Sequence, residues 1–265
     1  MTAIALTIAG SDSGGGAGIQ ADLKTFSALG VYGASALTAI TAQNTRGVNG
    51  VEAVSPGMVS GQIEAVLSDL DVGAIKIGMA ADAGIIEAIA GSLGAFGRKA
   101  VVDPVMVATS GDRLLASDAA DALRARLLPL AVVVTPNLRE AAILAGEEDI
   151  AETEADMLRQ AGRIMEAGPE AVLVKGGHGA RSEAVDILFD GERVRRFTAP
   201  RLDTTSDHGT GCTLSAAIAA RLAKGDSLAD AVAAAKAYLH EALAAASGLK
   251  VGQGRGPVHH FHRFW

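Results

Sequence analysis

Short apolar runs alternate with helical patterns along almost all of this chain, and this alternation limits the possible folds more than any other feature. The runs predict strands at Ile4–Ile8, Ala74–Ile77, Ala100–Val102, Ala131–Val134 and Ala171–Val174. Apolar residues at helical spacing predict helices at Ile19–Leu29, Met58–Leu70, Ala83–Phe96, Ala116–Leu128, Glu154–Ala167, Thr213–Ala223 and Leu228–Ala246. Strands that are apolar throughout and separated by helices indicate an α/β chain with a mostly parallel sheet, covered by helices on both faces.

One segment departs from this alternation. Ala184–Phe189 and Arg193–Phe197 flank Asp190-Gly191, which predicts a small antiparallel β-hairpin. No Pro-rich or Ser-rich linker and no internal repeat divides the 265 residues, so we expect residues 1–265 to form one domain. In such sheets ligands bind beyond the carboxyl ends of the strands.

Composition excludes several classes of function. The net charge of −7 argues against a nucleic-acid-binding surface, so an anionic ligand must be held by local donors. A single cysteine excludes an internal disulfide framework and a multi-cysteine zinc site. Met1–Ala9 has no basic region typical of a signal peptide, and no stretch has the uncharged apolar length of a transmembrane helix. We therefore expect a cytoplasmic protein that binds neither membrane nor nucleic acid.

The segment that carries most chemical information is Thr205–Thr213, TSDHGTGCT, which runs directly into an apolar helix. Gly209 and Gly211 flank Thr210 and allow a tight turn, so that backbone N–H groups converge at the start of the helix and favour an anion there. Cys212 lies in the same turn, where a helix N-terminus can lower the pKa of a thiol and make it a proton acceptor for a substrate hydroxyl. The alternative is that Cys212 is a small buried apolar residue.

A glycine-rich segment, GSDSGGGAG at residues 10–18, follows the first strand. Its glycines allow a ligand to approach the backbone closely, so we favour a ligand-contacting loop over a merely flexible turn. Residues 16–21 satisfy a relaxed dinucleotide-binding pattern, but no acidic residue follows about 20 positions on, which weakens a reading as an oxidoreductase. The Gly-Lys-Ser/Thr ending of a Walker A loop is also missing.

Polar residues follow several other predicted strands. Asp103 follows one of them, and Asn137 and Glu140 follow another at a spacing that suits either magnesium held through water or a helix capping box. Lys175 ends a further strand, where it would either meet a phosphate or extend its charged end to solvent. Gln43 could make a two-point amide contact with a heterocycle, or be an ordinary polar residue at a strand end.

Taken in order, these motifs resemble those of the hydroxymethylpyrimidine/phosphomethylpyrimidine kinases of thiamine biosynthesis. The resemblance covers nearly the whole chain and rests on segments 9–24, 38–45, 76–79, 103–106, 135–141, 174–178, 208–215 and 254–261. It implies a ribokinase-like three-layer α/β/α sandwich with a mostly parallel central sheet. It also implies ATP- and Mg²⁺-dependent phosphorylation of the pyrimidine alcohol and then of its monophosphate, by a protein that is commonly a homodimer.

The resemblance also assigns roles to individual residues. The substrate pocket would be formed by Gln43, which reads the pyrimidine ring, with Gly10, Asp22 and Met79. The nucleotide would be bound by Lys175, Asn137, Asp103 and Thr210, and magnesium by Glu140 and Asp103. Phosphoryl transfer would depend on Cys212, Lys175, Gly209 and Gly211, with Cys212 as the base where ribokinase relatives have aspartate.

Two alternative functions are compatible with the same fold. A pyridoxine/pyridoxal kinase acts on a similar primary alcohol on a flat heterocycle, and the sequence separates the two substrates poorly. A non-catalytic pyrimidine sensor is disfavoured, because such a protein need not keep the set Lys175, Asp103, Glu140 and Cys212.

Overall fold

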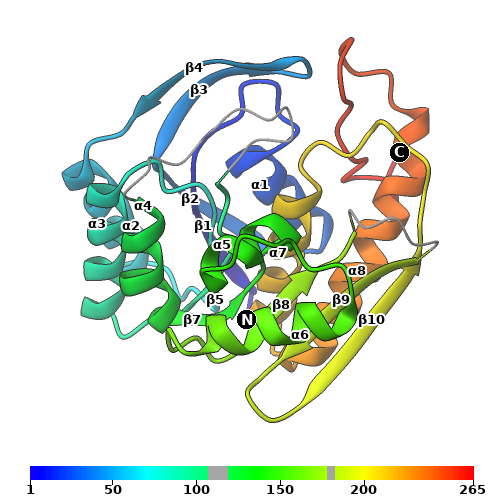
Figure 1. Cartoon of the computed structure of the whole chain (residues 1–265). Coiled ribbons are helices and arrows are strands. Elements are labelled where there is room, and N and C mark those ends of the chain that lie inside the picture. Colours follow the sequence, from blue (N-terminus) through cyan, green and yellow to red (C-terminus); the bar gives the residue numbers. More distant parts are fainter. Residues whose placement is uncertain (107–118, 178–182) are drawn as a thin grey trace.

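An eight-stranded sheet forms the centre of the computed structural model, which describes residues 1–106, 119–177 and 183–265 (Figure 1). Its strand order is β10-β9-β8-β7-β6-β5-β1-β2. The strands are β1 Ile4–Ala9, β2 Tyr32–Leu37, β5 Ala74–Ile77, β6 Ala100–Val102, β7 Ala131–Val134, β8 Val172–Lys175, β9 Glu183–Phe189 and β10 Val194–Pro200. The pairs from β2 to β8 are parallel, whereas β9 pairs antiparallel with both β8 and β10. The predicted parallel strands and the predicted hairpin are thereby confirmed, and the hairpin extends the main sheet.

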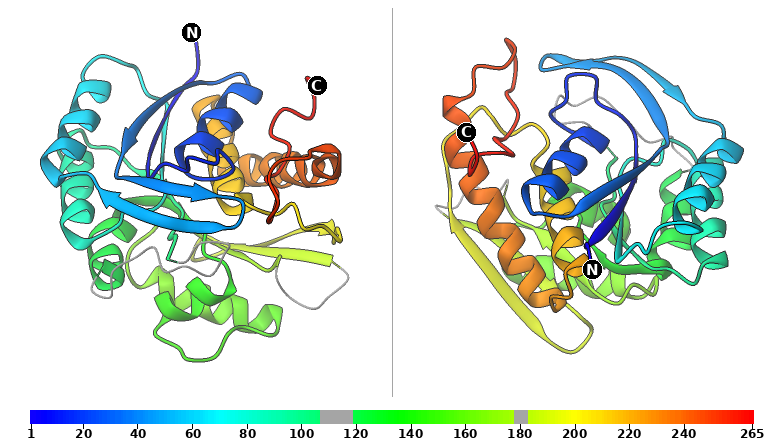
Figure 2. Two further views of the ribbon diagram at one scale, coloured as in Figure 1. Left: turned by 90° about the horizontal axis from the view of Figure 1, so that it is seen from above. Right: turned by 180° about the vertical axis from the view of Figure 1, so that it is seen from behind.

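Helices cover both faces of this sheet, which gives the expected three layers (Figure 2). They are α1 Gly18–Ala28, α2 Pro56–Leu67, α3 Ala83–Ala95, α4 Ala119–Ala122, α5 Leu138–Ala145, α6 Glu154–Met165, α7 Thr210–Ala223 and α8 Leu228–Ala245. One core lies under α2 to α6 and the other under α1, α7 and α8. Alternate residues of one strand enter different cores: Val172 and Val174 face the first, and Leu173 faces the second. This is why the strands are apolar throughout.

The sequence pattern missed β2 and α5. The β2 sequence, YGASAL, contains no β-branched residue, and it lies at the sheet edge paired with β1. Helix α5 is only eight residues long, too short for a clear apolar period. The predicted helix Ala116–Leu128 begins outside the described residues. Its described part is α4, then a π-helical turn at Leu123–Leu127 and a 3₁₀ turn at Leu128–Leu130.

A second sheet was also missed. It is a separate hairpin made of β3 Ala39–Asn44 and β4 Gly47–Ala53, which projects at the end of the molecule where the loops after β1 lie (Figure 1). Its register shifts between Ala42 and Gln43. Ser13 ties the hairpin to the glycine-rich loop, because its Oγ accepts the N–H of Gln43 (2.8 Å) and donates to the Gln43 carbonyl (2.6 Å).

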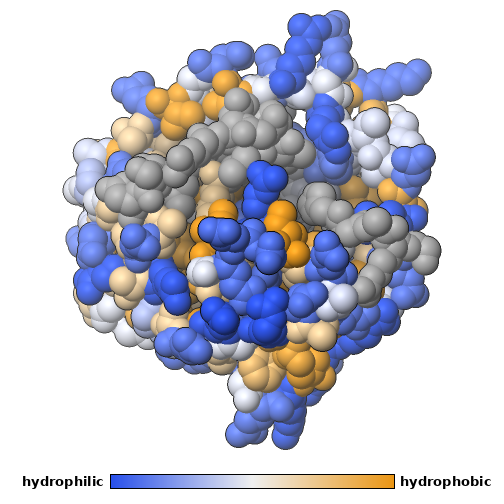
Figure 3. Space-filling model, viewed as in Figure 1, coloured by the Kyte–Doolittle hydropathy of each residue, from blue (hydrophilic) through white to orange (hydrophobic). Residues whose placement is uncertain are grey.

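Within residues 1–106, 119–177 and 183–265, no helix is both long and apolar enough to cross a bilayer. On the face seen in Figure 3, the coloured residues are mainly hydrophilic, with small and separate apolar groups.

Candidate active site

The turn before α7 and the glycine-rich loop after β1 pack directly against each other. Gly209 is the N-cap of α7 and has a φ of 81°, a left-handed conformation that favours glycine. A Cβ at Gly209 would collide with the carbonyl oxygen of Gly16, so this contact also requires glycine. No side chain caps α7, and the Thr210 N–H donates to the Asp207 carbonyl (3.3 Å). The tight turn predicted from Gly209 is therefore present at the start of α7, and its binding of an anion stays a prediction.

Asp12 organises the glycine-rich loop from within. Its carboxylate accepts the backbone N–H groups of Gly14 (2.8 Å), Gly16 (3.0 Å) and Ala17 (2.8 Å). It also lies 2.8 Å from Nε2 of His208, which joins the loop to the turn before α7. Burial raises the pKa of Asp12, but the hydrogen bonds from His208 and from the backbone outweigh burial and hold that pKa below its ordinary value. Sequence reasoning gave His208 no role, because its partner lies 196 residues away.

Cys212 lies between the N-termini of two helices, on α7 and beside Gly18 at the start of α1. Burial raises the pKa of the thiol to about 11, while the Lys76 ammonium and the Gly18 N–H oppose that rise. The carboxylates of Asp22 and Asp103 raise the pKa further. The expectation that the helix terminus lowers this pKa was therefore wrong, because burial has the larger effect.

Asp22 and Lys76 form a fully buried ion pair beneath this turn. Oδ2 of Asp22 accepts Nζ of Lys76 (2.8 Å) and Oγ1 of Thr7 (2.6 Å). Oδ1 of Asp22 has no hydrogen-bond partner among the described residues, although it is buried. Burial raises the pKa of Asp22, and the charge of Lys76 opposes this. Oδ1 therefore lacks a donor in a residue that is 0% exposed, and the predicted substrate contact of Asp22 stays a prediction.

Lys175 and Asp103 meet beside the turn before α7. Nζ of Lys175 lies 2.9 Å from Oδ1 of Asp103. A Cβ on Gly211 would lie 3.4 Å from the lysine nitrogen and 3.5 Å from Oδ2 of Asp103, so both groups border the turn. Asp103 also accepts hydrogen bonds from Thr135 (3.1 Å) and Ser215 (3.2 Å). Burial raises the pKa of Asp103, but the nearby lysines outweigh it and keep the carboxylate ionised.

Asn137 and Glu140 form a capping box at the start of α5. Oδ1 of Asn137 accepts the Glu140 N–H (3.0 Å), and Oε2 of Glu140 accepts the Asn137 N–H (2.8 Å). The capping alternative is thereby confirmed. Burial raises the pKa of Glu140 to about 7, with the Lys175 ammonium opposing and the Asp103 carboxylate adding to the rise.

A second capping box shows that capping alone does not explain the raised pKa of Glu140. Thr153 and Asp156 make the same reciprocal contacts at the start of α6, at the surface. There the hydrogen bond from Thr153 lowers the pKa of Asp156 to about 2, the opposite direction from Glu140. Glu140 therefore differs from an ordinary capping residue by its burial beside Asp103 and Lys175.

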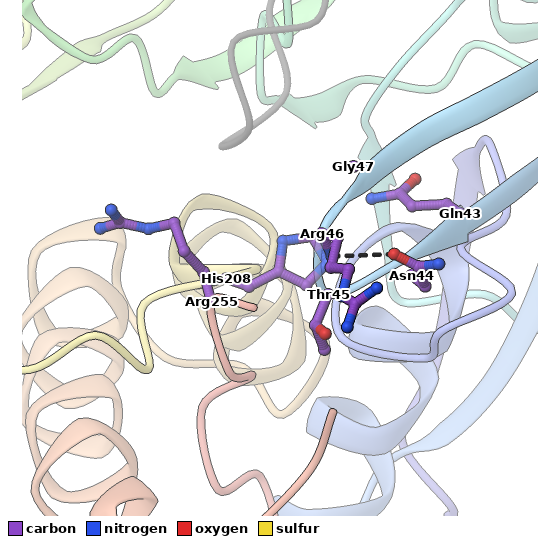
Figure 4. A pocket seen from close by; sticks show the side chains of 7 residues that line it. All are labelled: Gln43, Asn44, Thr45, Arg46, Gly47, His208 and Arg255. Atoms are coloured by element: carbon purple, nitrogen blue, oxygen red, sulfur yellow. Dashed lines mark hydrogen bonds between the residues drawn. The ribbon is translucent and has the colours of Figure 1, made fainter. Parts of the chain in front are cut away.

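The remaining predicted residues are not gathered at one place: Gly10 and Met79 are buried, whereas Gln43 lines a pocket that contains neither of them nor Asp22. Gly10 leaves room for the end of the Met79 side chain, which would collide with a Cβ there. Thr210 is the first residue of α7 and is half-buried. Gln43 lines a pocket of about 280 Å³ together with residues 44–47, His208 and Arg255 (Figure 4). This pocket lies between the β3–β4 hairpin, the turn before α7 and the C-terminal segment.

The fold and the site together define a class of protein. A parallel α/β sheet carries an anion-binding helix start, a lysine and buried carboxylates at its carboxyl end, with a polar pocket beside them. This is the arrangement of a ribokinase-like small-molecule kinase, in which positioning and charge stabilisation carry phosphoryl transfer.

The chain belongs to the phosphomethylpyrimidine kinase family, whose model matches residues 12–259. It is 68% identical to the hydroxymethylpyrimidine/phosphomethylpyrimidine kinase of Rhizobium meliloti (strain 1021) over 265 residues, which cover 100% of this chain and 99% of the relative. The protein is accordingly a kinase.

Two solved structures show the same fold. The phosphomethylpyrimidine kinase of Clostridium difficile 630 superposes with a TM-score of 0.80 at 45% identity, over 90% of this chain and 98% of that one. The ADP complex of Bacillus subtilis pyridoxal kinase superposes with a TM-score of 0.89 at 39% identity, over 98% of each chain. The nucleotide in the second structure agrees with the use of ATP by this fold.

Proposed function

We propose that this kinase transfers the γ-phosphoryl group of ATP to the alcohol of 4-amino-5-hydroxymethyl-2-methylpyrimidine, and then to the resulting monophosphate, in thiamine biosynthesis. The family match and the 68% identical relative support this substrate. The observation that carries the chemistry is the meeting of Lys175 and Asp103 at Gly211, one residue before Cys212.

On the nucleotide side, we assign the phosphates to Lys175 and to the amides of the turn at Gly209–Cys212. Lys175 is a cation at the border of an uncapped helix start, and both features stabilise the charge on a transferring phosphoryl group. Asn137, Asp103 and Thr210 complete the proposed nucleotide contacts. Asp103 keeps Lys175 in place through their 2.9 Å contact.

We assign Mg²⁺ to Glu140, with Asp103 as the second carboxylate. In the described part of the chain no three His, Cys, Asp or Glu side chains gather into a metal site, so the ion would need phosphate oxygens and water as well. Proteins usually bind Mg²⁺ through one or two carboxylates together with the phosphates of the substrate. Glu140 and Asp103 fit this mode of binding. Asp103 accepts hydrogen bonds from Lys175, Thr135 and Ser215, and Glu140 accepts the backbone N–H groups of Asn137 and Met106, so the ion would share both carboxylates with these donors. Bound there, the ion would neutralise phosphate charge during transfer.

On the acceptor side, we assign the pyrimidine to Gln43, Gly10, Asp22 and Met79. The unpartnered Oδ1 of Asp22 is suited to an amino group on the ring, and the side-chain amide of Gln43 to the edge of the heterocycle. A site that must satisfy a buried carboxylate oxygen discriminates strongly against rings that offer no donor.

We assign to Cys212 the role of accepting the alcohol proton. Because the pKa of the thiol is about 11, the thiolate is a small fraction at neutral pH. Lys76 and the Gly18 N–H favour that thiolate. If the thiolate is the base, turnover rises with pH above neutrality, and a pH-independent rate would remove Cys212 from this role.

We further propose that residues 1–265 act as one kinase domain in a cytoplasmic homodimer. Ile40 and Ala42 project from β3 on the face opposite the buried Ala39 and Thr41, and Ile40 is 55% exposed. An exposed apolar side chain on a separate small sheet is suited to contact with a second copy. ATP, the phosphoryl donor, is abundant in the cytoplasm.

The second candidate is a pyridoxal kinase, which the similarity to the Bacillus subtilis enzyme favours. The test is to compare kcat/KM for hydroxymethylpyrimidine and pyridoxal with ATP and Mg²⁺ in excess. We expect the pyrimidine to be preferred by at least about tenfold, the value of one well-placed contact. The reverse preference would assign the protein to vitamin B6 salvage, and no turnover of either would assign it to sensing.

A further inference from the structure

The strand end that carries Lys175 is held by groups outside the site assigned above. After Lys175 the chain continues into Gly176, whose N–H donates to the Val185 carbonyl (2.9 Å) and to Oδ1 of Asp186 (3.1 Å). A Cβ on Gly176 would collide with that same carbonyl, so the backbone here lies directly against β9. The position of Lys175 therefore depends on how β9 holds its neighbour.

The side chain of Asp186 lies on the face of the sheet that helix α8 covers. Asp186 pairs in register with Lys175, and two pairs further along Leu173 is opposite Leu188. Both leucines pack in the core under α7 and α8, so Asp186 lies on that face as well. There Oδ2 of Asp186 accepts Nζ of Lys236, on α8, at 2.6 Å.

This ion pair is buried, since Asp186 is 5% and Lys236 9% exposed. Burial raises the pKa of Asp186, and the charge of Lys236 opposes that rise. Buried pairs of this kind give little net stability relative to apolar residues that pack well. Stability alone therefore does not account for a charged pair in the alanine-rich helix α8. The pair does fix the position of the backbone at Gly176, because one oxygen of Asp186 binds Lys236 and the other accepts the Gly176 N–H.

We propose that Asp186 and Lys236 are positioning residues that fix Gly176 and, through it, hold Lys175 at the phosphate-binding turn. The proposal rests on the nucleotide role assigned to Lys175. Lys175 reaches Asp103 and borders Gly211, so a displacement of its strand end moves its ammonium group away from the phosphates. The pair therefore supports nucleotide affinity and leaves pyrimidine affinity alone.

The test compares Asp186→Asn and Lys236→Met with Asp226→Asn, which breaks an ion pair with Arg221 at the far end of α7. Titration calorimetry gives the Kd for ADP and for hydroxymethylpyrimidine, at a temperature where circular dichroism shows each variant folded. We expect the first two changes to raise the Kd for ADP by about 10- to 100-fold, as for other groups that orient a ligand contact. The Kd for the pyrimidine stays unchanged, and Asp226→Asn changes neither.

Three further variants make the test decisive. Lys236→Arg keeps the charge and is expected to recover ADP affinity relative to Lys236→Met. The double variant Asp186→Asn/Lys236→Met is expected to weaken ADP binding no more than the larger single change, since both act through one contact. Unchanged ADP affinity in Asp186→Asn, or equal losses of ADP and pyrimidine affinity, would overturn the proposal.

Lys175→Met separates this proposal from the function on which it rests. If Lys175→Met leaves the Kd for ADP unchanged, the nucleotide role of Lys175 is wrong and the positioning role falls with it. If Lys175→Met weakens ADP binding and Asp186→Asn does not, only the positioning role is wrong.

Discussion

Glu140→Gln is expected to stabilise the unliganded protein and at the same time to lower its activity. Glutamine keeps one oxygen that can accept the Asn137 N–H, so the change preserves the capping contact and removes the charge together with one acceptor oxygen. That charge lies beside Asp103, in a buried environment that raises the pKa of Glu140 to about 7. The carboxylate is therefore unfavourable in the folded protein until a cation reaches it.

The size of the effect follows from this pKa. In the unfolded chain Glu140 ionises near its ordinary value of 4.5, so between pH 4.5 and 7 the folded state binds the proton more tightly. The free energy of unfolding consequently falls as pH rises through that window and levels off above it. Glutamine does not titrate, so the advantage of Glu140→Gln is small at pH 4.5 and reaches about 3 kcal/mol above pH 7. Between pH 5.5 and pH 8 it grows by about 2 kcal/mol.

The assay is urea unfolding of both proteins at pH 5.5 and pH 8, without nucleotide or Mg²⁺. Glu148→Gln, at an exposed position after α5, is the matched control and is expected to change the free energy of unfolding by less than about 0.5 kcal/mol. A stabilisation that does not grow with pH, or a destabilisation at pH 8, would refute the reasoning. Turnover of Glu140→Gln is expected to fall by at least about tenfold, since the carboxylate proposed for Mg²⁺ is lost.

Four further predictions address the candidate site. The pKa of about 11 predicts that Cys212, the single cysteine, reacts with iodoacetamide at a rate that rises about tenfold per pH unit from pH 8 to 10, and a plateau below pH 9 contradicts this. Cys212→Ala is expected to lower turnover by about 10²–10⁴ with pyrimidine affinity kept. Gln43→Ala is expected to raise KM with kcat retained, because its contact is the same in the ground and transition states; a lower kcat at unchanged KM is the contrary result. Gly209→Ala is expected to lower the free energy of unfolding by at least about 2 kcal/mol, through its positive φ and its collision with Gly16. Gly91→Ala, with open space around it in α3, is the control, and an equal loss there would contradict the argument.

The parts of the fold that could be predicted are those with a strong local signal. β-Branched runs such as Ala131–Val134 and Ala171–Val174 marked the central strands, and Asp190-Gly191 marked the β9–β10 hairpin. β2 could not be predicted, because an edge strand of small residues packs well once β1 is beside it. Its stability comes from a tertiary contact that no local pattern contains.

The candidate site likewise combines features with a local sequence signal and features that depend on tertiary contacts. Lys175 and Asp103 meet beside Gly211, because polar residues after parallel strands lie at one edge of the sheet. What no motif contained were the long-range partners: His208 for Asp12, Lys76 for Asp22 and Lys236 for Asp186. The protonation states of Cys212 and Glu140 were likewise beyond the sequence, because both are determined mainly by burial.

The central claim, two successive phosphoryl transfers to a pyrimidine alcohol, is tested most directly by following the products with time. Purified protein is incubated with ATP, Mg²⁺ and hydroxymethylpyrimidine, and the pyrimidine species are quantified by mass spectrometry. The proposed function predicts that the monophosphate appears first and then declines as the diphosphate accumulates, with two ATP consumed for each pyrimidine. A reaction that stops at the monophosphate would contradict the second transfer, and an unmodified pyrimidine would contradict both.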